Sequence, residues 1–305
     1  MKKFMMLFTM LTMFFAMGFT AYANGLGENE QSAQTVVALG ADLSAEQRAE
    51  VLELMGLTEE TLAQCTVITI TNDMEHRYLD QYIDSSVIGT KSLSSVILRK
   101  AEAGNGVLVT TKNINYCTTG MYRNALLTAG LEDTNVLVVG PSKISGTAAL
   151  IGAVKAYEQI SGEPVPDKVL DAAMNELITT GELAEGENSE EIEELVAFIK
   201  AKLAAGELNS DEDIQNAITE GENKFQVSLT DEEKEKILAV MHKIKELGLD
   251  PEKLLDQAQD LYKKFGDELF QNAEEAVKQT ISQSVTRFFS DLGNRVKDFF
   301  IKLFS

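Results

Sequence analysis

The chain has 305 residues, with 27 Lys and Arg against 48 Asp and Glu, and a formal net charge of -21. Such a polyanion repels the phosphate backbone from which nucleic-acid binders draw most of their non-specific affinity, so we exclude nucleic acid as a partner. Hydrophobic residues make up 44% of the chain, which is ordinary for a globular protein and is enough for a core.

The N-terminus has the parts of a secretory signal peptide. Lys2 and Lys3 precede an uncharged apolar run from Phe4 to Phe19, and Ala21-Tyr22-Ala23 provides a small-x-small cleavage site. We therefore expect residues 1–23 to be removed after Ala23, and the mature protein to be secreted or associated with the cell surface. The alternative is an uncleaved anchor, because the uncharged stretch is long enough to span a bilayer.

Charge divides the remaining chain into three parts. Residues 24–161 carry a net charge of -7, residues 162–275 carry -19 and residues 276–305 carry +3. The sequence Gly162-Glu163-Pro164-Val165-Pro166 marks the first border, because glycine and proline interrupt regular structure. We expect an α+β domain, an acidic helical region and a basic amphipathic C-terminal helix, in that order.

The fold of the first domain is predicted from its strand and helix patterns. An apolar stretch at 35–39 and a helix capped by Ser44 come first. Strand patterns then occupy 66–71, 92–102, 106–114 and 135–139, with helix patterns at 74–83 and 120–129. Ala103-Gly104-Asn105-Gly106 is typical of a hairpin. The resulting β-α-β-β-α-β order predicts a ferredoxin-like sheet with strand order 4-1-3-2.

Cys65 and Cys117 are the only cysteines of the chain. In the predicted sheet, Cys65 lies just before the first strand and Cys117 just after the third, and these strands are antiparallel neighbours. Because exported proteins form disulfides, we expect a Cys65–Cys117 bond, and the alternative is two buried free thiols. The two histidines, His76 and His242, are too few for a His-rich zinc site, so we expect no metal.

The second half of the chain is predicted to be helical. Ser189 opens one helix, and Thr230 with Glu233 forms a capping box for another. From Asp250-Pro251 an apolar stripe continues to Leu303, which predicts a long amphipathic helix or a helical hairpin. Phenylalanines beside basic residues in 276–305 are typical of a helix on an anionic membrane surface. The alternative is a terminal helix that packs on the acidic helices before it.

Four stretches carry a family resemblance: TNDMEHRYL at Thr71–Leu79, SSVIGTKSLSS at Ser85–Ser95, KNINYCTTGMYRNALLTAG at Lys112–Gly130 and GPSKISGTAALIGAVKAYE at Gly140–Glu158. They resemble the exported domain-of-unknown-function family numbered one thousand and two, found in low-GC Gram-positive bacteria. The resemblance covers residues 35–161 well and the helical half loosely. It implies an exported protein and brings no activity, cofactor or catalytic residue with it.

Familiar catalytic motifs are absent from the sequence. The segment Gly140–Thr147 follows a strand and opens a helix, but it lacks the spacing and the lysine of a phosphate-binding loop. No Gly-x-Ser-x-Gly elbow surrounds a serine. Asp73, Glu75 and His76 cluster at the start of a helix and could perform acid-base chemistry. The alternative is that they cap the helix or face solvent.

Three loops of the predicted sheet, at 85–92, 113–119 and 140–147, fall on one edge. Two of them run into helix N-termini, whose unpaired N–H groups favour anions. We interpret this edge as a binding site for a phosphate or carboxylate, and the alternative is that Thr118 and Ser145 cap helices while the lysines are solvated. The candidate residues are Thr90, Lys91, Asn113, Asn115, Tyr116, Thr118, Lys143, Ser145 and Thr147.

Together these patterns favour an exported, non-catalytic binding or interaction protein of the cell envelope or the medium. We expect no cofactor, and a partner that is an anionic envelope polymer or another exported protein. Membrane-surface contact would involve residues 276–305. The alternative function is a hydrolase or transferase that acts on envelope polymers with an unrecognised active site at the same edge.

Overall fold

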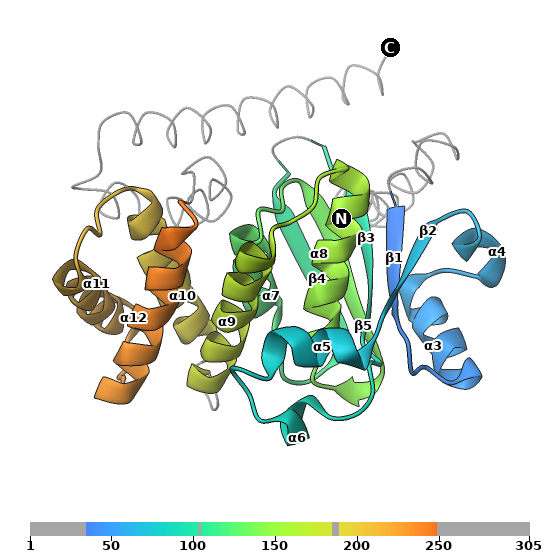
Figure 1. The fold of residues 1–305 in the computed structure, drawn as a ribbon, viewed down its shortest axis with the longest axis horizontal. Coiled ribbons are helices and arrows are strands. Elements are labelled where there is room, and N and C mark those ends of the chain that lie inside the picture. The colour runs from blue at the N-terminus through green and yellow to red at the C-terminus, as the bar shows by residue number, and fades with distance from the viewer. Residues whose placement is uncertain (1–34, 103–104, 185–188, 249–305) are drawn as a thin grey trace, which may run out of the picture.

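The computed structural model describes residues 35–102, 105–184 and 189–248. The predicted signal peptide at 1–23 and the predicted C-terminal amphipathic helix lie outside the described residues. Within them, five strands form one sheet with helices on both faces, and further helices extend the molecule to one side (Figure 1). The structure is therefore a mixed α+β fold, as predicted.

The sheet is mixed in direction. Its strands are β1 (Thr35–Gly40), β2 (Thr66–Ile70), β3 (Ser95–Lys100), β4 (Val107–Ile114) and β5 (Thr134–Ile144). Their order across the sheet is β2-β1-β3-β5-β4. Strands β1, β2, β4 and β5 run in one direction, and β3 is antiparallel to both of its neighbours.

The predicted ferredoxin-like order is wrong because the apolar stretch at 35–39 is an interior strand. All six residues of β1 are buried, as expected for a strand covered on both faces. β1 pairs with β2 and β3, and β5 lies between β3 and β4. The predicted hairpin around 103–106 is therefore also wrong, since the two strands that it joins are not neighbours.

Helices form two layers around the sheet. Helices α3 (Ala45–Met55) and α4 (Glu59–Leu62) cover one face. The other face carries α5 (Asn72–Leu79), α7 (Thr119–Thr128), α8 (Thr147–Ser161) and α9 (Asp167–Leu183), and the short α6 (Ser85–Ile88) follows α5. Alternate residues of β1 serve the two cores: Val37 packs towards α3, and Val36 packs towards α8.

The two parallel crossovers have opposite hands. The connection from β1 to β2 passes through α3 and α4, and the connection from β4 to β5 passes through α7. Both step in the same direction across the sheet, yet their helices lie on opposite faces. One crossover must therefore be left-handed, which is rare. In a ferredoxin-like sheet both crossovers are right-handed, so the rules used for the sequence prediction could not lead to this arrangement.

The predicted Cys65–Cys117 disulfide is wrong, because both cysteines are free. Cys65 precedes β2 and Cys117 follows β4, and these strands are parallel and form the two outer edges of the sheet. Cys65 therefore lies at the N-terminal end of one outer strand, and Cys117 lies at the C-terminal end of the other outer strand. Burial raises the pKa of Cys117 to about 12, which makes it an unreactive core thiol.

The acidic helices form a second core. Helices α10 (Ser189–Ala204), α11 (Asp211–Phe225) and α12 (Asp231–Glu246) bury their apolar faces against one another, and the rings of Phe198 and Phe225 meet edge to face with centroids 5.8 Å apart. The predicted capping box of Thr230 and Glu233 opens α12. Helix α9 follows the proline-rich border, but its buried face packs in the α/β core.

A buried ion pair joins this helical core to the α/β core. Lys200 of α10 is fully buried, and its Nζ lies 2.7 Å from Glu176 Oε1 of α9. The same ammonium donates to the Asn124 carbonyl at 2.6 Å and to Thr128 Oγ1 at 3.1 Å, both on α7. Each of its three protons thus has an acceptor. Burial lowers the pKa of Lys200, and the Glu176 carboxylate opposes this effect.

We predict that Lys200→Met destabilises the protein by about 3–5 kcal/mol, because it leaves the Glu176 carboxylate buried without its partner. The double variant Lys200→Met with Glu176→Leu should recover most of this loss, since it buries no charge. Urea unfolding measures both values. Lys236→Met is the control, because its ion pair with Glu182 is partly exposed and should contribute less than about 1 kcal/mol. Equal costs for the two single variants would contradict the prediction.

Candidate functional site

The ends of four strands meet at one edge of the sheet, here called the carboxyl edge. Because β1, β2, β4 and β5 are parallel, their C-terminal ends lie together, and the antiparallel β3 begins there. This is where ligands usually bind in open parallel sheets. The loops 85–92, 113–119 and 140–147 all lie at this edge, although the topology that brings them together differs from the predicted one.

Two of the candidate threonines are engaged by carboxylates of the protein. Thr147 is buried at the first turn of α8, and its Oγ1 donates to Glu75 Oε1 at 3.0 Å. Thr118 caps α7 by accepting from the backbone N–H of Met121, and its hydroxyl donates to the Glu193 side chain of α10. The same Glu193 carboxylate lies so close to Gly120 that a side chain at 120 would displace it. Glu193 therefore already provides an anion at the N-terminus of α7.

Two further candidates shape the backbone. Asn113 adopts a left-handed conformation with φ of 58°, and its Nδ2 donates to the Gly140 carbonyl at 3.1 Å. This hydrogen bond lies where the pairing register of β4 with β5 shifts, between Lys112 and Ile114. The hydroxyl of Tyr116 lies against Gly181 of α9, where a larger residue would collide with it. Both side chains therefore serve the fold at this edge.

The remaining candidates face outwards, and we call Thr90, Lys91, Asn115, Lys143 and Ser145 the outer polar set. Thr90, Lys91, Asn115 and Lys143 are exposed, and Ser145 is half-buried. Backbone bonds fix this part of the edge, since the Asn115 N–H donates to the Ile144 carbonyl at 3.0 Å. Within the described part of the chain, neither Lys91 nor Lys143 forms an ion pair.

The burial of Glu75 could not be predicted from the sequence. Its side chain is only 2% exposed, and burial raises its pKa, while hydrogen bonds from Thr147 and Asn72 oppose the shift. Asp73, by contrast, is exposed. His76 lies between Asp80, whose Oδ1 is 2.7 Å from Nδ1, and the Gly89 carbonyl, 3.1 Å from Nε2, and these two contacts raise the pKa of His76. The suggested acid-base trio therefore does not share one surface.

Neither a metal cluster nor a membrane span occurs in the described ranges. Among residues 35–102, 105–184 and 189–248, no three His, Cys, Asp or Glu side chains are grouped so that they could hold a metal ion. In the same ranges no helix combines the length and the apolar character needed to cross a bilayer.

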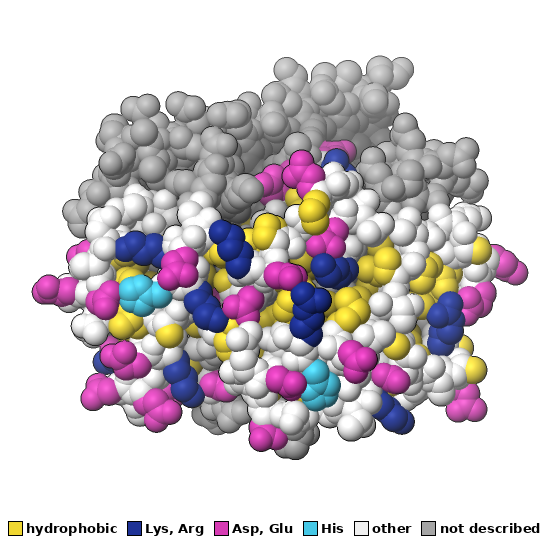
Figure 2. All heavy atoms as spheres, viewed as in Figure 1, with side chains coloured by type: hydrophobic (Ala, Val, Ile, Leu, Met, Phe, Trp, Pro, Cys, Tyr) yellow, Lys and Arg dark blue, Asp and Glu magenta, His cyan; other side chains and the backbone are white. Residues whose placement is uncertain are grey.

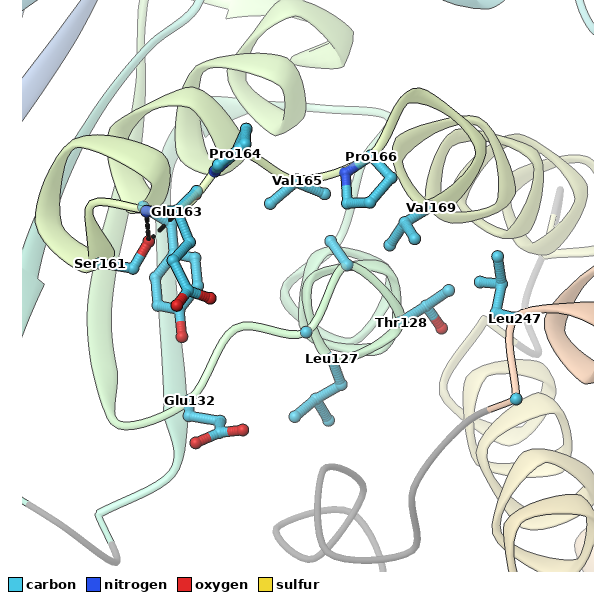
Figure 3. A pocket seen from close by; sticks show the side chains of 14 residues that line it. Leu127, Thr128, Glu132, Ser161, Glu163, Pro164, Val165, Pro166, Val169 and Leu247 are labelled. Carbon is cyan, nitrogen blue, oxygen red and sulfur yellow. Dashed lines mark hydrogen bonds between the residues drawn. The ribbon is translucent and has the colours of Figure 1, made fainter.

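A pocket of about 660 Å³ lies at the opposite edge of the sheet, and we call it the amino-edge pocket. Helices α7, α8 and α12 all end at it, and α9 begins there (Figure 3). Glu132 and Glu163 are its charged lining residues. The lining is Leu127, Thr128, Ala129, Gly130, Glu132, Tyr157, Ser161, Glu163, Pro164, Val165, Pro166, Val169, Leu247 and Gly248.

Comparisons with known proteins support one family. The model of DUF1002, described as a protein of unknown function, matches residues 39–261. The match extends further into the helical half than the resemblance of the sequence stretches indicated. The uncharacterized protein YpuA of Bacillus subtilis is 35% identical over 266 residues, which cover 87% of this chain and 89% of the relative. No solved structure matches.

We predict that Glu75→Gln removes a pH-dependent loss of stability. The folded state raises the pKa of Glu75 above its ordinary value of 4.5. The protonated Glu75 carboxyl therefore contributes fully to the unfolding free energy below pH 4.5, and this contribution is lost as pH rises through the pKa of the folded state. The wild-type protein should therefore lose unfolding free energy relative to Glu75→Gln as pH rises above 4.5. Urea unfolding at a series of pH values measures this difference.

The control for this experiment is Glu235→Gln, at an exposed position of α12. Its stability should run parallel to that of the wild-type protein over the same range of pH. A constant difference between the wild type and Glu75→Gln would show that the Glu75 carboxyl is not desolvated.

Proposed function

The chain belongs to the DUF1002 family of proteins of unknown function, and on the geometry of its carboxyl edge we propose that it is an exported, non-catalytic binding protein. Its ligand is an anionic polymer of the cell envelope, which binds through phosphate or carboxylate groups. The outer polar set forms the contact, and Lys91 and Lys143 provide the charge. The signal-peptide pattern at residues 1–23 supports the exported location.

The observation that carries this proposal is the unneutralised charge of the two lysines. The face shown in Figure 2 has basic side chains interspersed with acidic ones. Some basic side chains of the described residues form ion pairs, such as Arg77 with Asp167 at 2.8 Å and Lys243 with Asp171 at 3.0 Å. Lys91 and Lys143 have no such described partner, although the chain carries a net charge of -21. An anion can approach them without displacing a carboxylate of the protein.

Binding is favoured over catalysis because Glu75 and Cys117, two titratable groups of this edge, are buried. Glu75 is buried and holds hydrogen bonds from Thr147 and Asn72, so it presents no oxygen to a substrate. Cys117 is buried as well, and its raised pKa keeps it protonated. The groups of the outer polar set are hydroxyls, amides and ammonium groups, which bind anions but do not remove protons near neutral pH.

The test is binding of poly(glycerol phosphate), with polyglutamate as a second arm that replaces phosphate by carboxylate. We expect Lys91→Ala with Lys143→Ala to weaken binding at least tenfold, since each lysine near an anionic surface contributes about 1 kcal/mol and about 1.4 kcal/mol corresponds to a factor of ten. Isothermal titration calorimetry at low and high salt measures the affinities.

The matched control is Lys100→Ala with Lys168→Ala. Both of these lysines are exposed, and Lys100 ends the antiparallel β3, at the other edge of the sheet. This control should bind as the wild type does. The proposal fails if the wild-type protein binds neither polymer, or if the two double variants lose affinity equally.

A further inference from the structure

The amino-edge pocket has an electronegative character that the proposed function does not use. Three helices, α7, α8 and α12, end at it, and the C-terminal end of a helix carries partial negative charge. Glu132 and Glu163 add two carboxylates at exposed positions, and no Lys or Arg lines the pocket. The start of α9 opposes this field only in part, because Asp167 stands in its first turn.

The half-buried Tyr157 is affected by the same negative charge. Tyr157 lines the pocket, and its pKa is raised by burial and then by the nearby carboxylates of Glu132, Asp133 and Glu163. A group that enters beside this ring is therefore favoured if it carries positive charge.

The pocket also has an apolar surface. Val165, Val169 and Leu247 are half-buried and line it together with Pro164 and Pro166, and Figure 3 shows these side chains around the end of α7. A hydrogen bond from the Val165 N–H to Glu158 Oε1, at 2.9 Å, holds the proline-containing linker in place. The matching occupant is apolar and cationic at the same time.

We propose that the amino-edge pocket holds part of the chain's own C-terminal segment, residues 276–305. This segment carries five basic and two acidic residues and contains Phe288, Phe289, Phe299, Phe300 and Phe304. A phenylalanine ring fills the apolar part of the pocket, and a neighbouring Arg or Lys lies against Glu132 and Glu163. This inference is independent of the anionic ligand at the carboxyl edge.

The position of the chain at Gly248 favours this occupant over a separate molecule. Gly248 lines the pocket and is the last described residue, so the rest of the chain starts at the pocket itself. Residues 249–275 would span about 40 Å even if they were wholly helical, at about 1.5 Å per residue. This length allows the chain to run away from the pocket and the segment 276–305 to fold back into it. Such tethering gives the segment an effective concentration that an untethered partner does not have.

The test is zero-length carbodiimide cross-linking of the full chain, with an equal mixture of unlabelled and 15N-labelled protein. We expect amide links from Lys278, Lys297 or Lys302 to Glu132 or Glu163, formed within one chain. Glu212 and Glu232 are the comparison carboxylates, because both are exposed at the starts of other helices, and we expect at least fivefold fewer links to them.

A variant of the segment separates docking from chance encounters. Phe299→Ser with Phe300→Ser keeps every group that can be cross-linked, and it should lower the yield of links to Glu132 and Glu163 at least fivefold because the apolar contact is lost. Links spread evenly over all exposed carboxylates, links only between labelled and unlabelled chains, or an unchanged yield in the variant would each overturn the proposal. So would an absence of these links in a protein that floats with phosphatidylglycerol vesicles, since the segment would then lie on a membrane.

Discussion

The ammonium of Lys200 is fully buried, and its need for acceptors fixes how the helical region sits on the α/β core. A buried charge is tolerated only when it is paired and hydrogen-bonded. The acceptors come from α7 and α9 of the α/β core, whereas Lys200 itself belongs to α10. Separation of the two cores would leave Lys200 without its acceptors and Glu176 without its counter-charge, so the ion pair couples the cores energetically.

The geometry of both edges proposed as binding sites depends on this coupling. Because α10 is held against α7, Glu193 reaches the N-terminus of α7 and the hydroxyl of Thr118. Since α12 packs with α10, the end of α12 at Leu247 completes the amino-edge pocket. At the carboxyl edge Glu75 and Glu193 engage the threonines at the starts of α8 and α7, and the proposed ligand contact therefore involves the outer polar set. The pocket at the other edge has the opposite character, and it favours a cation.

The sequence predicts the features that depend on neighbours along the chain. The capping boxes at Ser44 and Thr230 form because their partners lie three residues away. Strand patterns of alternating or continuous apolar residues predict β2 and β5 for the same reason. The order of strands has no such local signal, and the short run that became β1 therefore changed the topology.

The candidate site was predictable only in part, because its contacts span long distances in sequence. Thr118 and Thr147 lie 75 and 72 residues from the carboxylates that engage them, and no spacing rule connects such positions. The burial of Glu75 likewise depends on α8, which starts far along the chain. Lys200 did carry a signal, since it interrupts the apolar run of α10 between Ile199 and Ala201. A lysine at a position that the helix periodicity assigns to the core indicates a buried partner.

We expect the two cores to behave as one cooperative body because of the buried ion pair. Native-state hydrogen exchange tests it most directly, because it gives an opening free energy for each helix. Slowly exchanging amides of α7, α9 and α10 should open with the same free energy as those of β3 and β5. If amides of α10 instead open at a free energy lower by more than about 1 kcal/mol, the cores open separately and the ion pair does not couple them.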